Sequence, residues 1–216
     1  AYRDQANSGY GTAIVGTVSG TSISFGSEQT IGNTSTWSNI SSCVFDSNVN
    51  KVAVCYRNDS KGKVSVGTIS GTSISFGSEV VLESSAAVDY SSMSFDPVAN
   101  TIVLAYNFSS RDLVRTATIS GTSISFGTKT DLATGSQGTP IETVYHAAAN
   151  KTVIIYRDSN NSNRLYTQTA TVSGTDVTVD TTANLTSESV YYGCAIYDST
   201  SEKIVMAYKD EAGGGK

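Results

Sequence analysis

Charged residues, histidine and cysteine are all scarce in this chain of 216 residues, and each scarcity excludes a class of protein. Only 15% of the residues are charged, the net charge is −5, and the isoelectric point is about 4.8. No basic run occurs, which argues against a surface for nucleic acid. No apolar run approaches the roughly 20 residues that a membrane-spanning helix needs, so no membrane span is expected.

Too few histidines and cysteines are present for the common catalytic and metal-binding sites. One histidine, His146, offers no His-based metal cluster and no Cys-His pair. The three cysteines, Cys43, Cys55 and Cys194, do not recur at equivalent positions, so they are expected to be small apolar strand residues. GxSxG, Walker A and HExxH motifs are absent. The glutamates share no motif that would support a glycosidase, so no enzyme is expected; they include Glu28, Glu79, Glu83, Glu142 and Glu188.

Two sequence blocks alternate along the whole chain. The octapeptide SGTSISFG occupies residues 19–26, 70–77 and 120–127, and a changed copy, SGTDVTVD, occupies 173–180. A second block ends each time in a tyrosine, as in FDSNVNKVAVCYRN; it covers 45–58, 95–108, 145–158 and 197–210. Self-similarity at a period of about 50 residues indicates a repeat architecture.

Each block predicts a β-hairpin. In the first block, Ser-Gly lies between runs of β-branched residues, and Ile23 and Phe25 then alternate with serines. In the second, an Asp/Asn cluster forms the turn, and the following strand is apolar on both faces, which indicates cover on both sides. Helix signals are absent. Four-stranded units of 40–50 residues in tandem are typical of a β-propeller.

We therefore expect an all-β chain that forms a single β-propeller domain over residues 1–216, with four blades of four antiparallel strands. The repeats are 37–81, 88–131, 138–185 and 190–210, and the last is completed by residues 1–31. Pairing of the N- and C-terminal hairpins would then close the ring. The alternative is a segment of a larger propeller or repeat array, because Tyr2-Arg3-Asp4 duplicates Tyr208-Lys209-Asp210. The opening AYRD, without Met or a signal peptide, suggests a mature product or a piece of such an array.

Metal binding has two weak candidates. Asp46, Asp96 and Asp198 occupy the second-block turns, where Asp usually binds its own backbone, and His146 replaces Asp in one copy. The three carboxylates could also bind Ca²⁺ around the axis of a ring. Residues 158–163 place oxygen ligands at alternate positions but lack the glycine and closing glutamate of a calcium loop. No cofactor is otherwise expected.

Ligand binding is predicted for the variable loops opposite these turns, because repeat proteins place recognition there. An aromatic ring beside polar groups can hold a sugar, although such rings also pack between blades. Arginines that follow the repeat tyrosine either pair with nearby Asp or contact an acidic ligand. The candidate binding residues are Trp37, Tyr90, Tyr191, Tyr192, Arg57 and Arg157.

Seven Asn-x-Ser/Thr sequences are candidate N-glycosylation sites in a secretory eukaryote and have no meaning in a phage or in most bacteria. They begin at Asn33, Asn39, Asn58, Asn107, Asn150, Asn160 and Asn184.

The pairing of GTAIVGTVSGTSISFGS with FDSNVNKVAVCYRN resembles tandem repeats of marine phage tail-fibre-like proteins and of large surface proteins of aquatic bacteria. The resemblance covers nearly the whole chain and implies an extracellular or virion-surface setting, with no catalytic residues to carry over. Two functions follow as expectations: an adhesive module that binds a carbohydrate or cell surface, or a structural subunit of a fibre, itself glycosylated in a suitable host, whose partners are copies of itself. Fold-level analogy alone does not decide between them.

Overall fold

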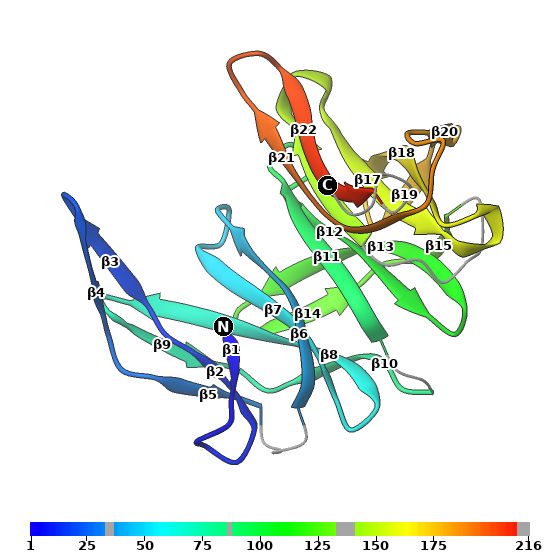
Figure 1. The fold of residues 1–216 in the computed structure, drawn as a ribbon. Coiled ribbons are helices and arrows are strands. Elements are labelled where there is room, and N and C mark those ends of the chain that lie inside the picture. Colours follow the sequence, from blue (N-terminus) through cyan, green and yellow to red (C-terminus); the bar gives the residue numbers. More distant parts are fainter. Residues whose placement is uncertain (33–36, 86–87, 133–140, 211–216) are drawn as a thin grey trace. The chain divides into compact units, whose positions relative to one another are not determined.

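The computed structural model describes residues 1–32, 37–85, 88–132 and 141–210, and the chain in this part is all β (Figure 1). Besides strands, two single-turn 3₁₀ helices occur in it, η1 (Ala147–Ala149) and η2 (Ser159–Asn161). No described helix has the length and apolar character to span a bilayer. The chain divides into two compact units, residues 1–88 with 119–125 and residues 89–118 with 126–216.

The three complete repeats each form a meandering antiparallel sheet with the same strand order. The first contains β6 (Trp37–Asp46), β7 (Lys51–Asn58), β8 (Lys61–Ser70), β9 (Ser73–Phe76) and β10 (Val80–Glu83). The second contains β11 (Val88–Asp96), β12 (Thr101–Phe108), β13 (Arg111–Ser120), β14 (Ser123–Phe126) and β15 (Thr130–Asp131). The third contains β16 (Ile141–His146), β17 (Lys151–Asp158), β18 (Arg164–Ser173), β19 (Asp176–Val179) and β20 (Ala183–Asn184).

Each of these sheets has five strands where the sequence predicts four, because the outermost strand is interrupted. In the first repeat β9 pairs with the end of β8, from Gly67 to Ser70, and β10 pairs with its start, from Gly62 to Val64. The break falls at the glycine that ends the octapeptide. The strand types and hairpins are therefore confirmed, and the uninterrupted outer strand is wrong.

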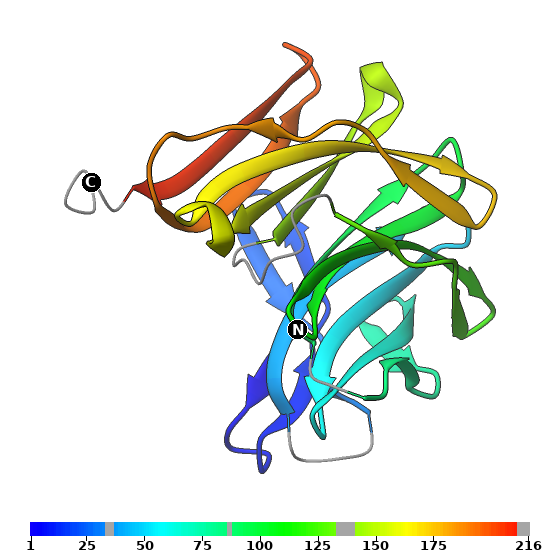
Figure 2. The same ribbon diagram turned by 90° about the vertical axis from the view of Figure 1, so that its right-hand side faces the viewer.

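The two ends of the chain form incomplete sheets. At the N-terminus β1 (Tyr2–Asp4), β2 (Tyr10–Ala13) and β5 (Gln29–Ile31) make a three-stranded sheet, and β3 (Gly16–Ser19) pairs with β4 (Ser22–Phe25). At the C-terminus β21 (Val190–Asp198) and β22 (Lys203–Asp210) make a two-stranded sheet, which lies beside β16 (Figure 2). The two halves of a fourth repeat are thus present, and their pairing into a closed four-blade ring stays a prediction.

The same contact joins successive repeats at the octapeptide. The glycine that ends each full copy meets the backbone of a threonine in the Ser-Gly-Thr turn of the following copy: Gly26 meets Thr72, Gly77 meets Thr122, and Gly127 meets Thr175. A Cβ at any of the three glycines would approach the threonine carbonyl closer than 3.0 Å, a distance that real Cβ atoms do not show. The octapeptide therefore recurs because the turn of one repeat packs onto the strand end of another.

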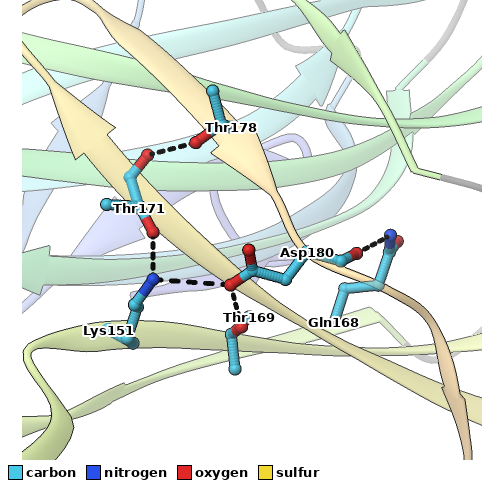
Figure 3. A network of polar contacts seen from close by, with 6 residues as sticks. All are labelled: Lys151, Gln168, Thr169, Thr171, Thr178 and Asp180. Carbon is cyan, nitrogen blue, oxygen red and sulfur yellow. Dashed lines mark hydrogen bonds and ion pairs between the residues drawn. The ribbon is translucent and has the colours of Figure 1, made fainter.

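The fourth copy departs from the motif at this same position. Asp180 replaces the glycine, and its carboxylate accepts hydrogen bonds from Thr169 Oγ1 at 2.5 Å and from Lys151 Nζ at 3.4 Å (Figure 3). The Asp180 backbone carbonyl accepts from Gln168 Nε2 at 2.9 Å. The Asp180 side chain is 57% exposed, so an aspartate is accommodated at the position that the other copies fill with glycine.

Candidate functional site

In each second-block turn, the side chain of the first residue accepts backbone hydrogen bonds from the residues that follow it. The Oδ1 atoms of Asp46, Asp96 and Asp198 each accept two backbone N–H bonds, from the residues two and three positions further on, at 2.9 to 3.3 Å. His146 holds its turn in a similar way, since its Nδ1 accepts a hydrogen bond from Ala149 N at 3.2 Å. Hydrogen bonds from Ser201 and the Thr200 backbone lower the pKa of Asp198. The turn function that the sequence predicts is confirmed for these residues.

The structure brings no metal site together from these carboxylates. Within the described ranges, no three His, Cys, Asp or Glu residues come close enough to hold a metal ion. In the calcium-like segment, Asp158 is buried, and its carboxylate accepts from the backbone of Asn160 and the side chain of Asn161. Asp158 thereby caps η2 as the other aspartates cap their turns.

Two of the predicted ligand-binding residues, Arg157 and Tyr191, lie in contact. The Arg157 guanidinium carbon lies 4.4 Å from the centre of the Tyr191 ring, a cation–π arrangement. Arg157 is 9% exposed, and its Nε and Nη1 are closed off from water with no hydrogen-bond acceptor. Because these two donors are buried beneath the ring, the pair suits packing of β17 against β21 better than an open ligand site.

The other predicted binding residues do not form one described cluster. Tyr90 is 43% exposed on β11, and Arg57 is half-buried on β7. Trp37 begins β6 opposite Asn58, but its side chain and that of Tyr192 lie outside the described part of the chain. The predicted aromatic loop site therefore stays a prediction.

A different site, which the sequence did not reveal, lies where the outer strand of the first repeat is interrupted. A cavity of about 400 Å³ there is lined by Gln29, Thr30, Gly32, Phe76, Gly77, Ser78 and Glu79. Gln29 and Ser78 are exposed, and the Phe76 ring is half-buried. The lining thus combines one aromatic side chain with several hydrogen-bonding groups.

Glu79 is held at this cavity by a buried polar network. Its carboxylate accepts from Tyr56 Oη at 2.9 Å and from Lys63 Nζ at 3.0 Å, and Tyr56 Oη also lies 2.8 Å from Ser65 Oγ. Burial raises the pKa of Tyr56, and the negative charge of Glu79 raises it further. The hydrogen bond with Ser65 opposes the shift. The network fixes one face of the Glu79 carboxylate. In the sequence, this glutamate could have been noticed because Glu28 stands at the same repeat position. Glu28 accepts a hydrogen bond from Tyr2 in the same way.

Burial restricts the glycosylation prediction. Asn58 and Asn107 are buried, and Asn107 Nδ2 donates to Asp112 Oδ1 at 3.0 Å, so neither amide is open to a glycan in the folded chain. Asn150, Asn160 and Asn184 are exposed. The side chains of Asn33 and Asn39 lie outside the described residues.

No family model, curated protein or solved structure matches this chain. Its function is therefore inferred from its own residues.

Proposed function

We propose that the chain is a non-enzymatic, adhesive repeat module of an extracellular or virion surface, and that it binds carbohydrate in the cavity beside Glu79. The setting comes from the resemblance of its repeats to tail-fibre-like and bacterial surface proteins. The observation that supports the binding function is the cavity of about 400 Å³, with Phe76, Gln29, Ser78 and the fixed Glu79 carboxylate in its lining.

The lining suits a sugar for two physical reasons. A sugar ring has apolar C–H faces that stack on an aromatic side chain, and its hydroxyls need several hydrogen-bonding partners in fixed positions. The carboxylate of Glu79 is a strong acceptor, and because Tyr56 and Lys63 hold it in place, little ordering entropy is lost on binding. A neutral or basic sugar fits this site better than an acidic one, since Glu79 would repel a second carboxylate.

A glycan array with the intact chain tests the proposal. Gln29→Ala combined with Ser78→Ala should lower the signal for the bound glycan about tenfold, since it removes two hydrogen-bonding groups. Thr128→Ala is the matched control, because Thr128 is exposed at the position of Ser78 in the next repeat and should leave the signal unchanged. A signal that survives the double change and disappears in Trp37→Ala would place binding in the aromatic loops instead.

A second candidate function, a structural subunit of a fibre, is favoured by a separate observation. The glycine–threonine contact between repeats occurs three times with the same residues, which is how a chain builds a rigid array. Electron microscopy of the purified chain tests this function: ordered filaments support it, and dispersed single particles at every concentration contradict it.

A further inference from the structure

The charge of the cavity beside Glu79 narrows the class of sugar that fits it, and this narrowing rests on the carbohydrate function proposed above. Of the lining residues that the structure describes, Glu79 alone carries a charge; the others are glycines, a phenylalanine and uncharged polar residues. The Glu79 side chain is 16% exposed, so it is partly open on the side of the cavity. The described lining therefore presents one negative charge, and no positive one, to a ligand.

The ammonium group beside Glu79 is shared with a second carboxylate. Lys63 Nζ lies 3.0 Å from Glu79 Oε1 and 3.9 Å from Asp59 Oδ2. The Lys63 side chain is 9% exposed and does not line the cavity, so its ammonium is held behind the Glu79 carboxylate. Glu79 thus has only a share of the Lys63 charge, and a cation that enters the cavity meets the carboxylate first.

The uncharged groups of the lining add further hydrogen-bond acceptors. Gln29 Nε2 already donates to Thr30 O at 3.4 Å, whereas the Gln29 carbonyl oxygen has no partner in the part of the chain that the structure describes. The Ser78 hydroxyl is exposed and can accept as well as donate. An ammonium group has three N–H donors and no acceptor, so it matches a lining of this kind better than a carboxylate or phosphate does.

The repeat itself does not require a glutamate at this position. The residue two places after the octapeptide is Glu79 in the first five-stranded sheet, Lys129 in the second and Thr182 in the third. Lys129 has the opposite charge, and its ammonium lies 5.3 Å from the centre of the Phe108 ring. The same strand order forms with a negative, a positive or an uncharged side chain there, so the charge of Glu79 belongs to the cavity and not to the fold.

We propose that the cavity binds a sugar that carries a free primary amine, with the ammonium group on the Glu79 carboxylate and the sugar ring against Phe76. The ammonium forms a charge-assisted hydrogen bond with Glu79, which is stronger than the bond that a neutral hydroxyl forms at the same place. Its remaining N–H groups are available to Gln29 Oε1 and Ser78 Oγ. N-acetylation of the amine removes the charge and two of the donors, so the acetylated sugar loses this advantage.

Isothermal titration calorimetry of the intact chain with three tetrasaccharides tests the inference. The probes are β-1,4-linked tetramers of glucose, glucosamine and N-acetylglucosamine, which differ only in the hydroxyl, ammonium or acetamido group of each ring. At a pH at which the amine is protonated, the glucosamine tetramer should bind about tenfold more tightly than the other two. Glu79→Gln should bring the three affinities close together and leave that of the glucose tetramer unchanged. Lys129→Gln, at the same position of the next repeat, is the matched control and should keep the preference.

Salt dependence is a second readout, and it does not depend on the folding of the Glu79→Gln variant. Raising the sodium chloride concentration should weaken binding of the glucosamine tetramer to the unmodified chain and leave binding of the glucose tetramer unchanged, because salt screens the attraction between ammonium and carboxylate. Equal salt dependence of the two tetramers would overturn the inference.

The affinities also separate this inference from the carbohydrate function on which it rests. Equal binding of the three tetramers, lost in Gln29→Ala combined with Ser78→Ala, would overturn the amine preference and support a carbohydrate site in the cavity. A preference for glucosamine that survives Glu79→Gln would overturn the assignment of the ammonium to Glu79. No binding of any tetramer would overturn the inference, and the absence of every signal on the glycan array as well would overturn the carbohydrate function itself.

Discussion

The repeat tyrosines combine full burial with satisfied hydroxyl groups. Tyr56, Tyr106 and Tyr156 are completely buried. The hydroxyl of Tyr56 binds Ser65 and Glu79, and that of Tyr156 donates to Gln168 Oε1 at 3.1 Å. A buried hydroxyl without a partner would cost free energy, and the first and third repeats supply different polar residues, Ser65 and Gln168, at the same place.

Tyr56→Phe is therefore expected to destabilise the chain by about 1–3 kcal/mol, because it leaves Glu79 and Ser65 with one partner fewer in a buried network. Tyr2→Phe is the matched control. Tyr2 also donates to a glutamate, Glu28, but it is 38% exposed, so Tyr2→Phe should destabilise the chain less than Tyr56→Phe does. Urea unfolding of both variants measures the two costs, and equal losses would contradict the role of burial.

Glu142 predicts a pH dependence of stability. Burial raises the pKa of Glu142 above its ordinary value of 4.5, and a hydrogen bond from Ser92 opposes the shift. A raised folded-state pKa means that the folded chain favours the protonated form of Glu142. The contribution of protonated Glu142 to folding stability is therefore fully present below pH 4.5, and it is lost as the pH rises through the folded-state pKa.

Glu142→Gln should accordingly raise the melting temperature at pH 7, and the difference from the parent chain should shrink toward pH 3. Thermal melts across this pH range measure it. Glu188→Gln serves as the control at an exposed glutamate and should change neither value. A melting temperature of Glu142→Gln that is lower at pH 7 would show that the charged form is stabilised instead.

At the scale of elements, copies of one hairpin with the same sequence differ in burial. Ile23 on β4 is 55% exposed, whereas Ile124 on β14 is 4% exposed, although both lie in an identical octapeptide. The sequence alone predicts equal burial for them. Burial depends on whether another repeat lies against the hairpin, and no local pattern encodes that.

Replacing these two isoleucines isolates the effect of that packing. Ile124→Ala should cost about 2–5 kcal/mol, because it leaves a cavity in a packed site. Ile23→Ala should cost less than about 1 kcal/mol in the single chain. Denaturant titrations at low concentration measure both, and a large loss in Ile23→Ala would mean that something already covers the first hairpin.

Sequence patterns predicted the elements better than the sites. Alternating Ile23 and Phe25, the doubly apolar strand before Tyr56, and the Asp46-type turns correctly indicated strands and hairpins, because these depend on neighbours within ten residues. The interrupted outer strand was missed because no local signal marks the break, which lies between Phe76 and Val80 in the first repeat and also between Val179 and Ala183 in the third, where Asp180 replaces the glycine. The cavity at the first of these breaks was missed because its lining joins residues of two repeats, such as Gln29 and Phe76, which no pattern within one repeat brings together.

At the scale of the whole molecule, one residue distinguishes the fourth copy of the octapeptide from the other three. Gly26, Gly77 and Gly127 each meet the turn of the following copy, whereas the fourth copy has Asp180, whose carboxylate binds Lys151 and Thr169.

The central claim is that one glycine–threonine contact joins the repeats at three places, and that Asp180 replaces the glycine in the fourth copy. Its most direct test is the free energy of unfolding of four variants: Gly26→Ala, Gly77→Ala, Gly127→Ala and Asp180→Ala. The first three should each lose about 1–3 kcal/mol, because the added methyl group overlaps the threonine backbone. Asp180→Ala should lose less than any of the three glycine variants, because it removes only exposed polar contacts. Similar small losses in all four would contradict this account of the repeat.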